Sequence, residues 1–158
     1  MPKLENGQTF PSLQLPLVGG GTLSLPEDLT GDFGVVLVYR GSGCPYCNAQ
    51  LAAFSRAQAD LESAGIKVVA LSVDDEQTST ELVAKRRLNF PVAHSADPDE
   101  VAATLGAYAN DEPRYLQSTG FVLAPDGTIV TAVYSSGAIG RLVPDDVVGL
   151  VRYVKEHS

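Results

Sequence analysis

Residues 35–51 read VVLVYRGSGCPYCNAQL, and the rest of the fold can be built outward from them. Their first five side chains form an uninterrupted run, apolar and rich in β-branched residues, which is typical of a strand buried in the middle of a sheet. From residue 48 onward, leucine and alanine recur at helical spacing. The stretch therefore predicts a buried strand, a short loop and a helix that begins at two cysteines.

Cys44 and Cys47 are the only cysteines of the chain. Proline suits the first position of a helix because its missing N–H has no partner there, so Pro45 places Cys44 at the N-cap and Cys47 one turn further in. The partial positive charge of a helix N-terminus favours a thiolate, the reactive form of cysteine. We therefore expect Cys44 to be a partly exposed nucleophile and Cys47 to attack a mixed disulfide formed on it. Tyr46 is expected to be exposed and to contact a reductant.

Two other uses of a cysteine pair compete with redox chemistry. A zinc site needs further ligands, and besides the two cysteines the chain offers only the histidines His94 and His157. A structural disulfide that closes so small a loop would constrain the unfolded chain little and would stabilise the fold only modestly. The redox interpretation is therefore favoured, and we expect neither a metal nor a cofactor. His94 is more simply a packing residue than a base for the dithiol.

The chain has 158 residues, a net charge of −8 and a pI near 4.6. This length suits a single domain with a sizeable core, which we place at residues 1–158. An acidic protein is repelled by nucleic acid and by anionic membrane surfaces, so we expect neither as a partner. No apolar segment has the length of a signal peptide or a membrane span, which favours a cytoplasmic location. In a reducing cytosol, a CxxC pair is expected to be catalytic.

The flanking sequence predicts alternating strands and helices. Apolar alternation on both sides of three glycines predicts a hairpin over residues 13–25, and the run 66–73 predicts a second buried strand. The helix that follows the cysteines is expected to stop at Gly65, and residues 121–134 to form a closing hairpin. Further helices are expected over 76–88, 98–108 and from Pro144. This order predicts an α/β, thioredoxin-like fold: a central mixed sheet flanked by helices, with an N-terminal β-hairpin extension.

Five segments follow one another in the order and spacing of a known family. They are GQTFP (7–11), the cysteine segment 39–51, VALSVD (69–74), FPV (90–92) and FVLAPDGTIV (121–130). Together they resemble the peroxiredoxins, the alkyl hydroperoxide reductase/thiol-specific antioxidant (AhpC/TSA) branch of the thioredoxin fold, over residues 7–153. More narrowly, the chain is similar to peroxiredoxin-like proteins that carry a thioredoxin-style CxxC. The resemblance implies an antioxidant oxidoreductase with a redox-active disulfide.

Peroxiredoxins usually carry a PxxxTxxC pattern that ends at the peroxidatic cysteine. With Cys44 in that role, the Pro and Thr places hold Leu37 and Gly41. With Cys47 in that role, they hold Arg40 and Cys44. Neither register supplies both residues, so the pattern leaves the identity of the nucleophile open, and its place at the helix N-cap favours Cys44.

The resemblance also implies a later arginine, three residues before the strand Phe, that polarises the peroxide. That place holds Ser118, and Arg114 lies near it but out of register. Arg40 could instead stabilise the thiolate. Compared with thioredoxins, the chain has Gly43 in the place of the Trp before the CxxC and Val38 in the place of the buried Asp. The Pro-Tyr pair between the cysteines is the pair that glutaredoxins carry.

These features support three functional hypotheses. The first is a thiol–disulfide oxidoreductase that uses the CPYC pair on a peroxiredoxin-like scaffold. The second is a thiol-dependent peroxidase in which one cysteine forms a sulfenic acid and the other condenses onto it. The third is a redox sensor or partner-binding protein without turnover. The first two require a disulfide or hydroperoxide substrate and an external dithiol reductant, either thioredoxin-like or a low-molecular-weight thiol. Relatives often form dimers, so a homodimer is also a possible state.

Overall fold

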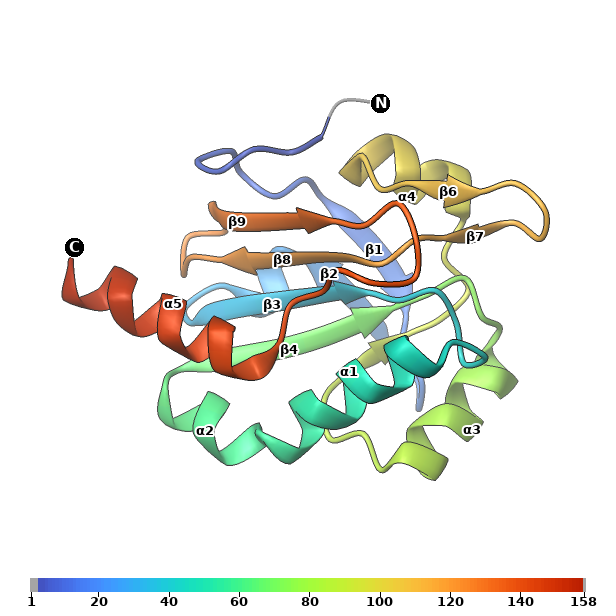
Figure 1. Ribbon diagram of the computed structural model, residues 1–158, viewed down its shortest axis with the longest axis horizontal. Helices are drawn as coiled ribbons and strands as arrows, with labels where there is room; N and C mark the ends of the chain where they lie inside the picture. The colour runs from blue at the N-terminus through green and yellow to red at the C-terminus, as the bar shows by residue number, and fades with distance from the viewer. Residues whose placement is uncertain (1–2, 158) are drawn as a thin grey trace.

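A computed structural model describes residues 3–157; Met1, Pro2 and Ser158, the ends of the predicted domain, lie outside the described residues. Its centre is a five-stranded sheet in the order β5-β4-β3-β8-β9 (Figure 1). The strands are β3 (Phe33–Val38), β4 (Ile66–Leu71), β5 (Val92–Ala93), β8 (Thr119–Leu123) and β9 (Ile129–Tyr134). Because β3 pairs parallel with β4 and antiparallel with β8, the sheet is mixed, as the sequence predicts.

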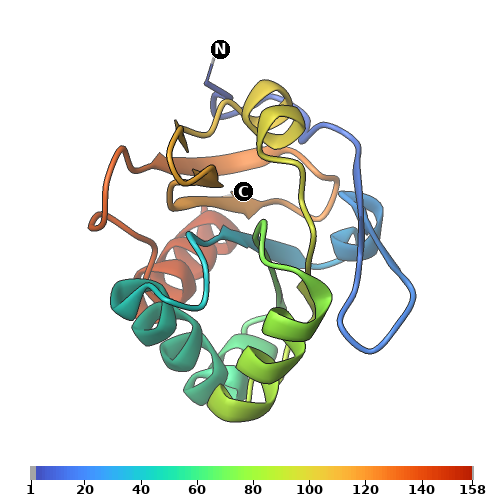
Figure 2. The same ribbon diagram turned by 90° about the vertical axis from the view of Figure 1, so that its right-hand side faces the viewer.

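Both faces of the sheet are covered (Figures 1 and 2). The elements on one face are α1 (Pro45–Arg56), α2 (Gln58–Ser63), α3 (Glu76–Arg86) and α5 (Pro144–Glu156). Those on the other are the hairpin β1 (Leu13–Pro16) and β2 (Thr22–Leu25), the 3₁₀ turn η1 (Glu27–Leu29) and α4 (Pro98–Leu105). The predicted N-terminal hairpin is therefore confirmed, and it packs as a cover over one face of the sheet.

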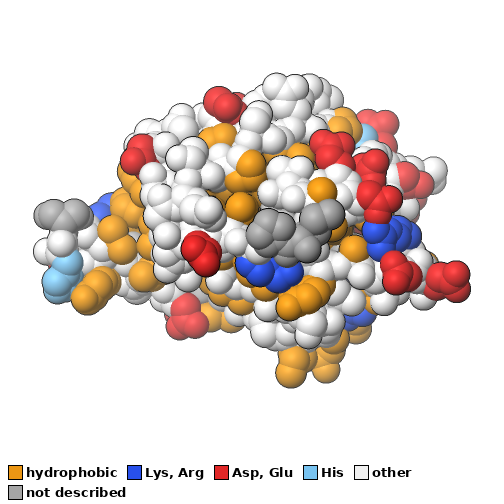
Figure 3. Space-filling model, turned by 90° about the horizontal axis from the view of Figure 1, so that it is seen from above, with side chains coloured by type: hydrophobic (Ala, Val, Ile, Leu, Met, Phe, Trp, Pro, Cys, Tyr) orange, Lys and Arg blue, Asp and Glu red, His pale blue; other side chains and the backbone are white. Residues whose placement is uncertain are grey.

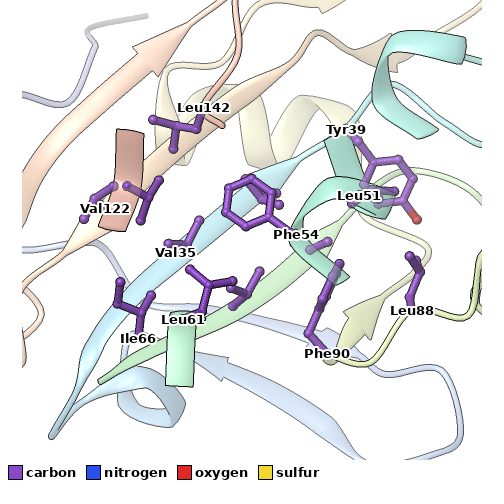
Figure 4. Close-up of a cluster of buried hydrophobic side chains, with 14 of the residues drawn as sticks. Val35, Tyr39, Leu51, Phe54, Leu61, Ile66, Leu88, Phe90, Val122 and Leu142 are labelled. Carbon is purple, nitrogen blue, oxygen red and sulfur yellow. The ribbon is translucent and has the colours of Figure 1, made fainter. Parts of the chain in front are cut away.

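Strand β3 supplies both hydrophobic cores because successive side chains of a strand point to opposite faces. Val35 and Leu37 pack in the core beneath α1, α2, α3 and α5, whereas Val36 and Val38 pack in the core beneath the hairpin and α4. Figure 4 shows the first core, where Phe54 from α1 lies above the sheet. A strand buried on both faces reads as a continuous apolar run, which explains why the sequence alone identified it.

The helix predicted to run from the cysteines to Gly65 is in fact two helices. The chain leaves helical geometry at Ala57, where φ is −88° and ψ is 9°, and α2 starts at the next residue. Phe54 and Leu61 lie seven residues apart, so they would share one face of an unbroken helix. Both are also fully buried in the two separate helices, so their apolar pattern is the same in either case. The break contains neither glycine nor proline, which is why the apolar pattern does not reveal it.

A second difference follows α4. The helix predicted over 98–108 ends at Leu105, because Gly106 adopts the left-handed conformation (φ 77°) that terminates helices. The next residues form a small hairpin, β6 (Ala109–Asn110) with β7 (Tyr115–Leu116), which the sequence did not predict. Its strands are two residues long, too short for any alternation to be visible.

Three segments meet at one end of the sheet, the end at the right of Figure 1 that faces the viewer in Figure 2. They are the loop from β3 to α1, the β6–β7 hairpin and the loop 135–143 between β9 and α5. The carboxyl ends of the parallel strands β3 and β4 also lie at this end, where ligands bind in open α/β sheets.

Candidate active site

Cys44 is the N-cap residue of α1, as the sequence predicts. Its backbone is extended (φ −94°, ψ 113°), and Pro45 takes the first helical position. The Sγ atom of Cys44 accepts a hydrogen bond of 3.3 Å from the backbone N–H of Cys47. An otherwise unpaired donor of the first helical turn is thereby directed at the sulfur, which favours its anionic form.

The two cysteines differ in their access to solvent. Cys44 is 9% exposed, whereas Cys47 is completely buried and its Sγ accepts a 3.3 Å hydrogen bond from the backbone N–H of Arg40. Tyr46 is 54% exposed beside them. Both cysteines are thus buried, and the partly exposed Cys44 that the sequence predicts is not observed; Cys44 nevertheless lines the cleft described below, whereas Cys47 does not.

Two arginines converge on the Cys44 sulfur. Nη1 of Arg40 lies 3.9 Å from Sγ, and Nη2 of Arg141 lies 3.7 Å from it. Arg40 was expected from the sequence. Arg141 was not, because it lies 97 residues away in the chain, in a loop without a recognisable motif. A 2.6 Å hydrogen bond from Nη2 to the carbonyl of Ala138 helps to fix the Arg141 side chain.

These surroundings lower the pKa of the Cys44 thiol. Burial alone would raise the pKa, but the hydrogen bonds from the Cys47 thiol and backbone N–H, with the positive charges of Arg141 and Arg40, outweigh it. The thiolate fraction at neutral pH is therefore larger than that of an ordinary cysteine.

The Cys47 thiol shifts in the opposite direction. Burial, together with the hydrogen bond that its thiol donates to Cys44, raises the pKa of Cys47 to about 11, against the lowering effect of the Arg40 backbone N–H. The fold therefore favours the proton on Cys47 and the thiolate on Cys44, which makes Cys44 the more reactive sulfur of the pair.

The loop that carries Cys44 is held from both sides. The backbone N–H of Ser42 donates to Oδ2 of Asp74 at 2.8 Å, and the carbonyl of Ser42 accepts from Nδ2 of Asn48 at 2.9 Å. Gly41, one residue earlier, has a φ of +144°, and a Cβ there would lie 3.1 Å from Oδ1 of Asp74. These contacts fix the approach of the chain to the helix N-terminus.

An open cleft of about 480 Å³ lies in front of Cys44. Its walls come from the β3–α1 loop, the end of β4 and the β6–β7 hairpin. The residues that line it are Arg40, Gly41, Ser42, Gly43, Cys44, Pro45, Val73, Asp74, Pro113, Arg114 and Tyr115. Tyr115 closes the far wall: its hydroxyl accepts a 2.8 Å hydrogen bond from Nη2 of Arg40, and its ring lies 5.2 Å from the Arg40 guanidinium.

The remaining candidates from the sequence lie outside this cluster. Ser118, in the expected place of the peroxide-polarising arginine, is buried at the start of β8, and its carbonyl accepts from the N–H of Ser135. His94 is buried, and its ring nitrogens face Ser95 (2.8 Å) and Glu76 (3.7 Å). Within residues 3–157, no three His, Cys, Asp or Glu side chains are placed to share a metal ion.

The AhpC/TSA family model matches residues 6–132 of this chain. The chain belongs to that family. A relative in Mycobacterium tuberculosis that is assigned to the peroxiredoxins is 31% identical over 147 residues, covering 89% of this chain and 91% of the relative. A peroxiredoxin of Methanothermobacter thermautotrophicus is 27% identical over 92% of this chain and 71% of its own length.

Solved structures of the family have the same fold. Mycobacterium bovis AhpC superposes with a TM-score of 0.85 at 20% identity, over 100% of this chain and 96% of that one. The peroxidoxin BcpB of M. tuberculosis gives a TM-score of 0.81 at 20% identity, over 96% of this chain and 98% of that one. The resemblance to a peroxiredoxin-like protein and the thioredoxin-like fold predicted from the sequence are thereby confirmed.

Proposed function

We propose that this protein is a thiol-dependent peroxidase with Cys44 as the peroxidatic cysteine. The observation that carries the proposal is the convergence of the Arg40 and Arg141 guanidinium groups within 4 Å of the Cys44 sulfur, at the wall of an open cleft. In the sequence, the place expected for the peroxide-polarising arginine holds Ser118 instead. Two arginines from other elements now surround the sulfur, where they can orient a peroxide and stabilise the charge that develops in the reaction.

Unpaired donors support the binding of an oxygen ligand. In the part of the chain that the structure describes, Nε of Arg40 and both Nε and Nη1 of Arg141 are buried without a hydrogen-bond partner. Buried donors without partners cost free energy, and a peroxide bound beside the sulfur would supply acceptor oxygens for them.

The reaction proceeds in two chemical steps. The Cys44 thiolate attacks one peroxide oxygen, the O–O bond breaks, and Cys44 becomes a sulfenic acid while an alcohol or water leaves. Cys47 then attacks the Cys44 sulfur and releases water, which leaves an internal disulfide. The Cys44 thiolate contributes to the raised pKa of Cys47, so this contribution disappears once Cys44 is oxidised, and Cys47 becomes easier to deprotonate.

A thiol–disulfide oxidoreductase is the second candidate. The CPYC pair at a helix N-terminus favours it, as does Gly41, which leaves the place of the peroxiredoxin threonine without a hydroxyl. In this case the Cys44 thiolate attacks a substrate disulfide, and Cys47 resolves the mixed disulfide into the internal one. In both candidates an external dithiol attacks Cys44, the sulfur that lines the cleft, to restore the reduced pair.

The test is the rate at which reduced protein consumes hydrogen peroxide. The chain has no tryptophan, so rapid quenching, alkylation and mass spectrometry would follow the reaction. We expect oxidation much faster than that of a free thiol, loss of this reaction in Cys44→Ser, and accumulation of a trappable sulfenic acid in Cys47→Ser. Oxidation at the rate of a free thiol would reject the peroxidase. Rapid exchange with a small disulfide in the same preparation would then favour the second candidate.

The setting of this activity is also a proposal. We place the protein in the cytoplasm, as a monomer or homodimer, with a thioredoxin-like protein or a low-molecular-weight thiol as its reductant. None of the helices in residues 3–157 has the length and apolar character that a membrane crossing needs. The exposed ring of Tyr46, next to Cys44, is the contact that we expect the reductant to use.

A further inference from the structure

Breaking a peroxide bond requires a proton as well as a nucleophile. When the thiolate attacks, the second peroxide oxygen departs with an electron pair as hydroxide or alkoxide, both strong bases unless they are protonated as they leave. Gly41, which has no side chain, occupies the position at which peroxiredoxins carry a threonine hydroxyl. Among the described residues that line the cleft, Ser42 and Tyr115 carry hydroxyl groups.

Tyr115 is the hydroxyl that is coupled to the reacting sulfur. One guanidinium links the two: Nη1 of Arg40 faces Sγ of Cys44 at 3.9 Å, and Nη2 of Arg40 donates to the Tyr115 hydroxyl at 2.8 Å. Since the tyrosine oxygen accepts this bond, it keeps its own proton for a second hydrogen bond. The hydroxyl thus lies on the same cleft as the sulfur, with a donor proton and a cation beside it.

The wall that carries Tyr115 is anchored. Its neighbour Leu116 is completely buried, and Arg114 binds the carboxylates of Asp99, on α4, and Asp111. In Figure 3, Asp and Glu side chains gather around Lys and Arg at the right-hand end of the molecule, where α4 and the β6–β7 hairpin lie. These contacts hold the hairpin, and with it the Tyr115 hydroxyl, at a defined position.

We propose that Tyr115 is the proton donor to the leaving oxygen, an inference that rests on the proposed peroxidase function. The S–O bond forms as the O–O bond breaks, Cys44 is oxidised to the sulfenic acid, and the reduced leaving oxygen takes the Tyr115 proton and departs as water or alcohol. The tyrosinate that remains is stabilised by the Arg40 guanidinium that already touches its oxygen. A proton from the solvent in the open cleft restores the phenol.

The test compares two oxidants in wild type and Tyr115→Phe, which keeps the ring against Arg40 and removes only the hydroxyl. Hydrogen peroxide releases hydroxide, a strong base that needs a proton as it leaves. Peracetic acid releases acetate, a weak base that can leave without one. We expect hydrogen peroxide to oxidise the variant more slowly by about a hundredfold or more, because a general acid typically contributes about 10²–10⁴-fold. Oxidation by peracetic acid should change less than about threefold.

Two controls distinguish this role from positioning. Tyr153→Phe removes an exposed tyrosine hydroxyl of α5 that does not line the cleft, and it should leave the rates with both oxidants unchanged. The pH profile of Cys44 alkylation should be the same in Tyr115→Phe and wild type. Equal losses of rate with both oxidants, together with a shifted alkylation profile, would show that Tyr115 only positions Arg40, and this would overturn the proposal. An unchanged rate with hydrogen peroxide would also overturn it. A wild type as slow as a free thiol would instead reject the peroxidase itself.

Discussion

Cys44 and Cys47 lie three residues apart, yet their thiols titrate in opposite directions. The pKa of Cys44 is lowered because hydrogen bonds from Cys47 and two cationic side chains outweigh its burial, whereas the pKa of Cys47 is raised mainly by burial. The fold thus favours the thiolate on the sulfur that lines the cleft and the protonated form on the sulfur enclosed behind it. This difference between the two residues supports Cys44 as the proposed nucleophile, a choice that the sequence motifs had left open.

Replacing Arg141 tests the contribution of the arginine that the sequence did not reveal. Arg141→Met keeps much of the side-chain length but removes the charge 3.7 Å from Sγ of Cys44. The pKa of Cys44 should rise, so its alkylation by iodoacetamide should require a higher pH. The rate of oxidation by hydrogen peroxide should fall about a hundred- to a thousandfold, because a donor to the developing charge is lost as well. Arg152→Met, which removes an exposed arginine of α5 that does not line the cleft, is the matched control. Equal effects of the two substitutions would contradict the role of Arg141.

Residues whose role follows from local sequence could be predicted, and residues brought in by tertiary structure could not. The placement of Cys44, Pro45 and Cys47 follows from the rules of a helix N-terminus, and Arg40 lies four residues before Cys44. Arg141 reaches the sulfur only because the β9–α5 loop folds back over the start of α1. No pattern within a single sequence reports such a contact, which is formed by the packing of distant elements.

At the scale of elements, the site depends on how the loop between β3 and α1 approaches the helix. The loop turns sharply at Gly41 and is then held by Asp74 and Asn48 through the backbone of Ser42. The strand and the helix were predictable because their apolar patterns are long. The break between α1 and α2 and the β6–β7 hairpin were not, because the first has no breaker residue and the second has very short strands.

Two glycines in this loop provide a matched pair of substitutions. Gly41→Ala forces a side chain into a φ of +144° and against Asp74, whereas Gly43→Ala meets nothing within 4 Å. We expect the first to destabilise the reduced protein by about 1 to 3 kcal/mol, the usual cost of a strained backbone conformation, and to slow oxidation of Cys44. The second should alter neither property appreciably. Urea denaturation measures the stability of each variant, and peroxide consumption measures the rate of Cys44 oxidation. Equal behaviour of the two variants would refute this account of the loop.

At the scale of the whole molecule, one sheet joins the two cores, since β3 contributes side chains to both. The two layers should therefore unfold together, which supports the proposal of a single domain over residues 1–158. The mixed sheet was predictable because every long apolar run in the sequence became a strand or a helix. The way in which the layers enclose Cys47 could not be predicted from the sequence. Because Cys47 is completely buried, the chemistry of the site is linked to the stability of the fold.

The dependence of stability on pH tests this link. The fold raises the pKa of Cys47 from 9.0 to about 11, so between these pH values the unfolded chain releases a proton that the folded protein keeps. A group with a raised pKa contributes its full stabilisation below its unfolded pKa, and this contribution is lost as the pH rises toward the folded pKa. The free energy of unfolding of the reduced protein should therefore fall by about 2 to 3 kcal/mol across this window because of Cys47.

Cys47→Ala removes that contribution, while the lysines and tyrosines that titrate in the same range are common to both proteins. Urea denaturation in the presence of a reductant, at intervals from pH 8 to 11.5, should give a steeper decline for wild type than for the variant, and a single transition in both. Parallel curves would mean that Cys47 is not held protonated by the fold. Cys47 would then ionise as readily as a free thiol, and the division of roles between the two cysteines would have to rest on their positions relative to the cleft alone.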